Sequence, residues 1–200
     1  MKKKVLLVIV VTILLILTGI VYYNYEYGLK ECDDFYKFVY NLQIDEIDGK
    51  EEFYLPVFVD YYGTDLPIND DFTINGEQIQ SEIIDTEYGK ALKITGYNIT
   101  NIEFDKEYNK IPDFIESSVK MSMDQELDNG HDYGYWIYYN NSQSNESINI
   151  DFEFDIYTGG SFRYKGDCLW AGKRVNFNSS NEIELDWNFV TGVYEEGHKN

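Results

Sequence analysis

The segment 148–156 reads Ile-Asn-Ile-Asp-Phe-Glu-Phe-Asp-Ile and is the clearest structural signal in the chain. Its even positions are all apolar, and its odd positions all carry an amide or a carboxylate. Successive side chains of a β-strand point to opposite faces of a sheet, so this alternation predicts a strand with one buried and one solvated face. We therefore expect the fold to be a sheet with a one-sided core.

Similar short runs occupy most of the chain from Phe53 onward. They are separated by turn signals such as Asn75-Gly76 and Thr158-Gly159-Gly160-Ser161, and Pro56 marks an edge strand or the start of a strand. About ten short strands with close turn spacing predict a mainly β chain, folded as an antiparallel β-sandwich or a jelly-roll-like domain. The pattern does not choose between these two architectures.

The N-terminal segment 5–23 has a different character, since it contains no charged residue. About 20 apolar residues are what a helix needs to cross a bilayer. Lys2, Lys3 and Lys4 precede the segment, and this positive charge predicts that residues 1–4 form a cytoplasmic tail. The sequence thus predicts a transmembrane helix that anchors the chain in the cell membrane by a single pass, with the C-terminal domain extracytoplasmic.

A cleaved secretory signal is the competing interpretation of the same segment. Its apolar region would be long for a signal, and residues 16–22 contain no small-x-small cleavage pattern. We therefore favour an uncleaved signal-anchor.

Residues 24–48 are expected to form a juxtamembrane helical connector. Their apolar residues recur in steps of three and four, as on one face of a helix; they are Leu29, Cys32, Phe35, Phe38, Val39 and Leu42. The composition then changes, which places the extracytoplasmic β domain at residues 49–194 and a short tail at 195–200.

The charge of the chain restricts its partners. The net charge is −20 at pH 7, and all 36 acidic residues lie at or after Glu26. Nucleic acid and anionic membrane surfaces would both be repelled by such a domain. We therefore expect no nucleic-acid partner; the membrane is contacted through the N-terminal helix, and the outer domain meets cell-surface carbohydrate or envelope proteins.

Cys32 and Cys168 are the two cysteines of the chain. An even pair in an oxidising extracytoplasmic compartment favours a disulfide bond, which would join the juxtamembrane segment to the far end of the domain. Two unpaired thiols, in a species that rarely oxidises its exported proteins, are the alternative.

An acidic turn offers a candidate metal site. Its acids stand at alternate positions around Asn129-Gly130; they are Asp124, Glu126, Asp128 and Asp132. The spacing resembles a calcium-binding loop, but Asn129 stands where the EF-hand pattern has glycine, and Tyr135 stands where it has the final acid. Calcium is therefore a candidate cofactor, and a solvated acidic turn is the simpler interpretation.

Four Asn-x-Ser/Thr sequons begin at Asn98, Asn140, Asn145 and Asn178, each in an expected turn or loop. They would carry glycans if the host glycosylates outside the membrane, and in an asparagine-rich chain chance occurrence explains them equally well.

A hairpin between residues 135–139 and 148–152 supplies the candidate ligand site. Pairing Tyr139 with Ile148 puts Trp136 and Tyr138 on the outer face, beside Asn149 and Asp151. Exposed rings next to hydrogen-bonding groups are typical of a sugar-binding surface. The alternative is that a helix or loop covers the rings.

Catalytic motifs are absent from the sequence. It has no Gly-rich phosphate loop, no His/Cys metal spacing and no nucleophile elbow. With 36 acids a pair of carboxylates is always available on paper, so it carries no information. We expect an extracytoplasmic binding or display module, with a two-carboxylate surface hydrolase and a structural subunit of an envelope complex as alternatives.

Overall fold

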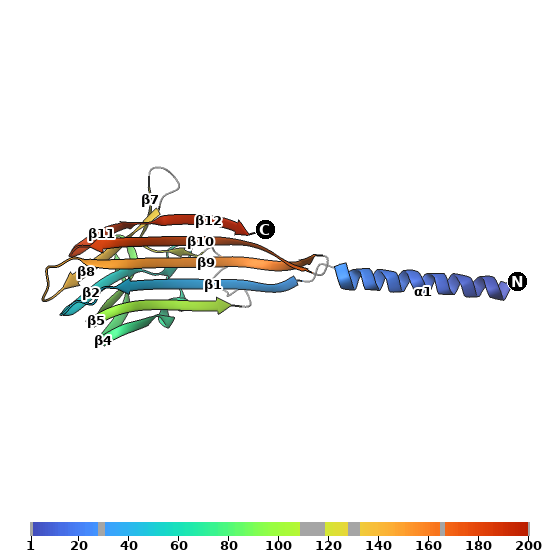
Figure 1. The fold of residues 1–200 in the computed structure, drawn as a ribbon, viewed down its shortest axis with the longest axis horizontal. Coiled ribbons are helices and arrows are strands. Elements are labelled where there is room, and N and C mark those ends of the chain that lie inside the picture. Colours follow the sequence, from blue (N-terminus) through green and yellow to red (C-terminus); the bar gives the residue numbers. More distant parts are fainter. Residues whose placement is uncertain (1, 28–30, 109–118, 128–132, 165–166, 200) are drawn as a thin grey trace.

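A computed structural model of the chain describes residues 2–27, 31–108, 119–127, 133–164 and 167–199. Side chains are described for residues 11–24, 36–108, 119–127, 133–159 and 172–197. One N-terminal α-helix is followed by strands, as Figure 1 shows, and a short helix, η1 (Pro67–Asp71), lies between the third and fourth strands.

The helix α1 spans Lys2–Tyr27 and extends away from one end of the β domain (Figure 1). Within the described part of the chain, no helix combines the length and the apolarity that a bilayer crossing needs.

A ten-stranded antiparallel sheet makes up most of the domain. Its strand order is β11-β8-β2-β5-β1-β9-β10-β12, with β4 also paired to β5 and β7 to β8. The bounds are β1 Glu31–Ile44, β2 Lys50–Pro56, β4 Thr73–Thr86, β5 Gly89–Tyr108, β7 Asp124–Glu126, β8 Tyr133–Asn141, β9 Ile148–Tyr164, β10 Asp167–Ile183, β11 Asp186–Thr191 and β12 Val193–Lys199. Two short strands, β3 (Phe58–Val59) and β6 (Lys120–Met121), form a separate pair.

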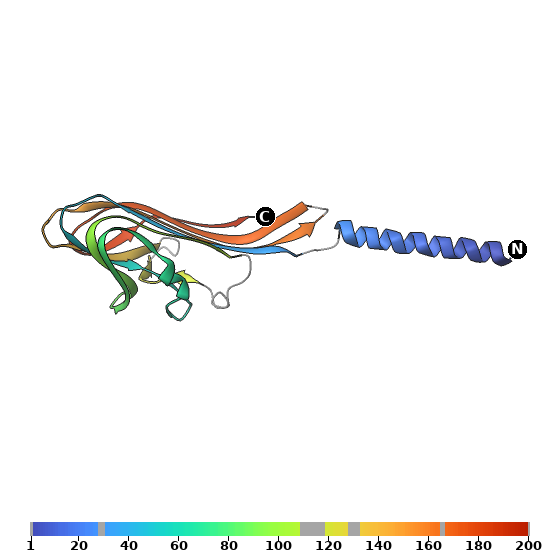
Figure 2. The same cartoon turned by 90° about the horizontal axis from the view of Figure 1, so that it is seen from below.

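The main sheet curls into a half-barrel, as the view in Figure 2 shows. The predictions of a mainly β chain and of antiparallel pairing are confirmed. The expected two stacked sheets are not what forms, because β5, β9 and β10 are long strands of 20, 17 and 17 residues that twist and bring one sheet round upon itself. Alternation in the sequence shows which side chains are buried, but it is the same for a sandwich and for a curled sheet.

The predicted helical connector at residues 24–48 is wrong. Residues 31–44 form β1, which lies inside the sheet between β5 and β9. The buried side chains of this strand stand at every second position; they are Tyr36, Phe38, Tyr40, Leu42 and Ile44. The apolar residues of this segment fit both the helical spacing of three and four residues and the strand spacing of two. The strand is favoured because it pairs along both edges and buries these large side chains. The first part of the outer region is therefore a central element of the β domain.

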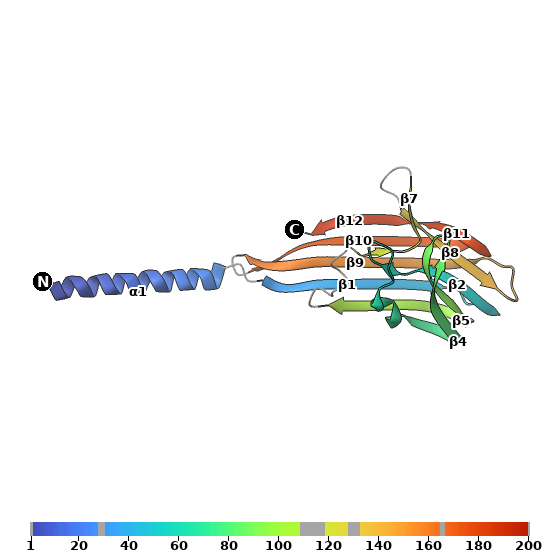
Figure 3. The same cartoon turned by 180° about the vertical axis from the view of Figure 1, so that it is seen from behind.

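The inner face of the curl holds an aromatic core. The rings of Tyr40 and Phe152 lie 5.1 Å apart, and those of Tyr135 and Phe177 lie 4.8 Å apart. The short helix η1 (Pro67–Asp71) and the β3–β6 pair cover this core, and Figure 3 shows them in front of the long strands. Asn69 of η1 holds β3 in place, because its Nδ2 donates to the Phe58 carbonyl at 2.7 Å and its Oδ1 accepts the Phe58 N–H at 3.0 Å.

The predicted hairpin has the right parity and the wrong partners. All six residues expected in the core are buried: Tyr135, Ile137, Tyr139, Ile148, Ile150 and Phe152. Strand β8, however, pairs with β2, β7 and β11, whereas β9 pairs with β1 and β10. Three strands, β2, β5 and β1, therefore separate the two halves of the expected hairpin.

Candidate functional site

Trp136 and Tyr138 belong to a group of stacked rings outside the half-barrel. We call this group the outer aromatic cluster; its members, all partly buried, are Tyr54, Tyr88, Trp136, Tyr138, Trp187 and Phe189. Tyr88, from the turn between β4 and β5, lies nearly parallel to Trp136 with ring centroids 4.2 Å apart. Tyr54 lies over Tyr138 at 4.5 Å. Through these ring contacts the β4–β5 turn packs against the outer face of β8 and β11.

This stacking removes the flat, open surface that the sequence predicted. Trp136 is flanked by Tyr88 and by Phe189, whose ring lies 5.2 Å away. Asn149 and Asp151 are exposed on the outer face of β9, where the Asn149 amide donates to Asp45 at 3.0 Å. The structure therefore does not bring the four predicted ligand-binding residues together, and a loop covers one ring, as the alternative interpretation proposed.

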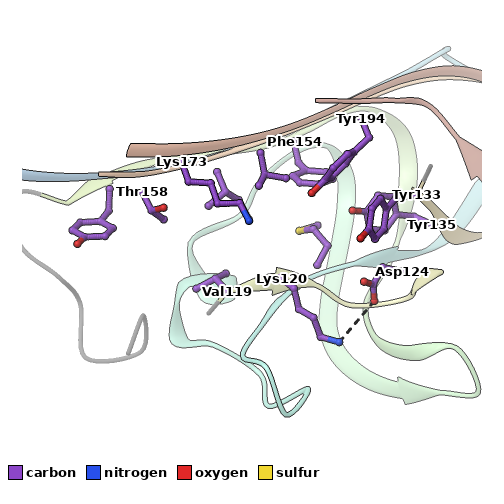
Figure 4. A pocket seen from close by; sticks show the side chains of 13 residues that line it. Val119, Lys120, Asp124, Tyr133, Tyr135, Phe154, Thr158, Lys173 and Tyr194 are labelled. Carbon is purple, nitrogen blue, oxygen red and sulfur yellow. Dashed lines mark ion pairs between the residues drawn. The ribbon is translucent and has the colours of Figure 1, made fainter. Parts of the chain in front are cut away.

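A pocket of about 660 Å³ opens on the inner side of the sheet, and we call it the concave pocket. Figure 4 shows it from close by. Its lining residues come from β1, from β9, β10 and β12, and from Val119 through β8; they are Tyr36, Val119, Lys120, Met121, Asp124, Tyr133, Tyr135, Phe154, Ile156, Thr158, Lys173, Val175 and Tyr194. The size falls within the range of roughly 300 to 1,000 Å³ that small-molecule and cofactor sites occupy.

The concave pocket is lined as it is because of strand alternation. On β9, the inward residues Phe154, Ile156 and Thr158 follow one another at every second position. Lys173 and Val175 do the same on β10, and Lys173 reaches into the pocket in Figure 4. The result is an apolar wall with tyrosine hydroxyls and two ammonium groups around it.

The charged groups of the concave pocket are already paired. Lys120 Nζ lies 4.0 Å from Asp124 Oδ1, and Lys173 Nζ lies 2.5 Å from Glu196 Oε1. Desolvation raises the pKa of the Asp124 carboxyl above its ordinary value, and burial likewise raises the pKa of the neighbouring Tyr135 hydroxyl. Such a site offers its ligand apolar surface and neutral hydrogen-bonding groups more than net charge.

The hydrolase alternative stays a prediction, and the described part of the concave pocket adds no support to it. Glycoside hydrolysis uses two carboxyl groups on opposite sides of the scissile bond. Among the described lining residues Asp124 is the one carboxylate.

The candidate calcium loop is described only in part. Asp124 lies in the concave pocket and Glu126 is exposed on β7, whereas Asp128 and Asp132 lie outside the described residues. The described residues contain no cluster of three or more potential metal ligands. Calcium binding by this loop stays a prediction.

The sequons lie mostly in strands instead of turns. Asn145 is in the exposed loop between β8 and β9, as expected. Asn98 lies in β5, Asn140 in β8 and Asn178 in β10. Asn140 and Asn178 are nevertheless exposed, so three of the four sequons point to solvent and glycosylation stays a prediction.

The side chains of Cys32 and Cys168 lie outside the described ones, and no disulfide is seen. The strand register places Cys32 opposite Ser161 and Cys168 opposite Arg163, so β9 runs between the two cysteine-bearing strands. Two strand spacings amount to about 9.6 Å, whereas a disulfide needs Cα atoms within about 7 Å. The disulfide stays a prediction, and this register disfavours it.

Glu51 is a residue whose importance the sequence did not indicate. Its side chain is fully buried on the inner face of β2, where Oε2 accepts the Ile99 N–H at 2.8 Å. Its Oε1 has no hydrogen-bond partner among the described residues. Burial raises the pKa of Glu51 to about 7. The one available signal was parity, since Glu51 stands two and four residues before the apolar Phe53 and Leu55.

Comparison of the chain with known protein families, curated proteins and solved structures finds no match.

Proposed function

We propose that this protein is a membrane-anchored, extracytoplasmic binding module whose ligand occupies the concave pocket. The observation that carries the proposal is the pocket itself, about 660 Å³ in volume and lined by apolar side chains, tyrosines and two lysines. Sites of this kind, apolar with a few polar groups, are where soluble domains bind small molecules or single side chains of a partner.

The anchor is proposed from the sequence. The uncharged segment 5–23 follows Lys2, Lys3 and Lys4, and it lies within the helix Lys2–Tyr27. An uncharged segment of 19 residues with a basic N-terminal flank favours insertion with the N-terminus in the cytoplasm. The β domain would then be held outside the cell membrane.

Carbohydrate is the first ligand class to test. Tyr36, Tyr133 and Tyr194 line the concave pocket together with Thr158. Tyrosine combines a ring face for the apolar side of a sugar with a hydroxyl for its polar groups. A glycan array probed with the full chain in detergent micelles tests this class.

A photo-crosslinking residue in place of Thr158 tests the site in intact cells. We expect a discrete adduct that is lost when Val175→Trp fills the pocket. Val193→Trp is the matched control, because Val193 is 62 % exposed and its side chain lies outside the pocket. A crosslinking residue in place of the exposed Ser180, on the outer face of β10, reports non-specific labelling. Equal labelling from the two positions, or no adduct from position 158, would overturn the proposal.

A further inference from the structure

We propose that β12 and the concave pocket together accept an extended, basic segment of a partner protein as an added β-strand. This inference rests on the proposed function, because the pocket is the site that receives the side chains of the added strand. It goes beyond that function by naming the kind of partner and its binding mode.

Strand β12 is a regular edge. It is the last strand in the sheet order and, in the part of the chain that the structure describes, it pairs with β10 alone. The pairing runs without a register shift from Val193 to Lys199. The edge strand β4, by contrast, has two register shifts, between Asn75 and Glu77 and between Glu77 and Gln80. Bulges protect an edge from further pairing, and an edge without them exposes a row of unpaired N–H and C=O groups.

The chain changes partners just before β12, which opens the half-barrel at this point. Thr191 of β11 still pairs with Gly134 of β8, whereas Val193 pairs with Asn178 of β10. Gly192 makes the crossing possible, because a Cβ there would collide with the Asn178 carbonyl oxygen. Beyond this residue the chain no longer pairs with β8, although the rings of Tyr133 on β8 and Tyr194 on β12 still lie 4.6 Å apart, and both line the concave pocket.

The side chains of β12 alternate in a way that suits an added strand. Tyr194 lines the concave pocket, and Glu196 pairs with the pocket residue Lys173. Val193 and Glu195 are exposed. A strand added to β12 would turn alternate side chains to the same inner side, next to Tyr194 and Glu196. Main-chain hydrogen bonds would then supply affinity and the pocket would supply selectivity.

Charge decides which partner fits this edge. The chain carries a net charge of −20, and the exposed Glu195 adds a carboxylate to the outer side of the edge. Lys or Arg at the outward positions of the added strand would be attracted, and acidic segments would be repelled. A second copy of this acidic chain is disfavoured for the same reason. The predicted occupant is therefore a partner segment with apolar and basic residues in alternation.

Fluorescence anisotropy with the full chain in detergent micelles tests the proposal. The probe is a labelled peptide of sequence Lys-Val-Lys-Phe-Lys-Val-Lys, compared with two N-methylated forms. Each form is methylated at alternate residues, so that one edge of the peptide loses its N–H donors and the charge is unchanged. Strand addition predicts that binding weakens about tenfold for one form and persists for the other, since several main-chain hydrogen bonds are lost. Equal binding of both forms would show mere charge attraction and would overturn the proposal.

Two variants of the chain make the test specific. Val175→Trp fills the pocket and should weaken the peptide about tenfold. Glu195→Lys should weaken the lysine peptide and strengthen a peptide with Glu in place of Lys. If Val175→Trp does not fold, the binding of the two methylated peptides and the effect of Glu195→Lys on peptide binding still test strand addition. Loss of the Thr158 adduct in Val175→Trp without any peptide binding would refute strand addition and leave the proposed function standing. Sedimentation that shows self-association through β12 would name a second copy as the occupant and also overturn the proposal.

Discussion

Replacing Glu51 by Gln should remove the loss of stability that ionisation of this side chain causes between about pH 4.5 and pH 7. The Glu51 side chain is fully buried, and burial raises its pKa from the ordinary 4.5 to about 7. A folded-state pKa above the unfolded value means that the folded chain binds this proton more tightly. The contribution is therefore fully present below about pH 4.5 and is lost as the pH rises through about 7.

The magnitude follows from these two values. At about 1.4 kcal/mol for each pH unit, the difference between 4.5 and about 7 is worth up to about 3 kcal/mol. Gln has nearly the same shape and keeps an oxygen that can accept the Ile99 N–H. Since Gln cannot ionise, the variant should lose little stability at pH 5 and should be more stable than the unmodified chain at pH 8.

Urea denaturation of the full chain in mild detergent, at pH 5 and at pH 8, measures this effect. The quantity to compare is the change in the free energy of unfolding between the two pH values, for the unmodified chain and for Glu51→Gln. Other acids of this chain also add to the pH dependence, so Glu77→Gln, at an exposed position of β4, serves as the control. Equal pH dependence of the unmodified chain and Glu51→Gln would refute the reasoning.

Three further predictions concern the core, the crossing at β12 and the topology. Ile150→Ala removes a buried core side chain that is 1 % exposed and should cost about 2 to 5 kcal/mol of stability. Trp136→Ala loses ring stacking and should cost about 1 to 2 kcal/mol. The urea midpoints of the two variants measure this difference, and equal costs would contradict the partial exposure of Trp136. Gly192→Ala should destabilise the domain by about 1 to 3 kcal/mol, because its Cβ has no room, and Gly197→Ala, with open space around its Cβ, should be nearly neutral; a thermal melt that ranks them the other way would refute the close approach. External protease should digest the part of the chain after Tyr27 in intact cells, and its protection there would rule out the proposed orientation.

Local alternation was enough to identify the inward residues of β8 and β9 but not their neighbours. Tyr135, Ile137 and Ile150 were assigned correctly to the core, because parity along a strand depends on that strand alone. Pairing depends on which edges meet in space, and a strand of suitable parity pairs equally well with several others. The predicted site of Trp136 and Asp151 does not form for this reason, because it required β8 and β9 to be paired strands as well as the correct parity of each strand.

The concave pocket could not be read from the sequence. Its lining joins β1, at the start of the domain, to β12, at the end of the chain, and no local pattern connects Tyr36 with Tyr194. The burial of Glu51 could not be predicted for a related reason. A glutamate next to another acid in the sequence is expected to be solvated, and only the placement of the neighbouring strands shows that it is buried.

By itself, the sequence determined that the chain is mainly β and antiparallel, that segment 148–156 has one buried face, and that the net charge is −20. These properties depend on composition and on neighbours along the chain. The tertiary structure alone decided that residues 31–44 form a central strand, that the sheet curls on itself, and that β12 follows β10 in the sheet order and lines the concave pocket. Each of these outcomes depends on long strands that twist and on pairings between residues more than a hundred positions apart, such as Tyr40 with Phe154, and neither leaves a periodic trace in the sequence.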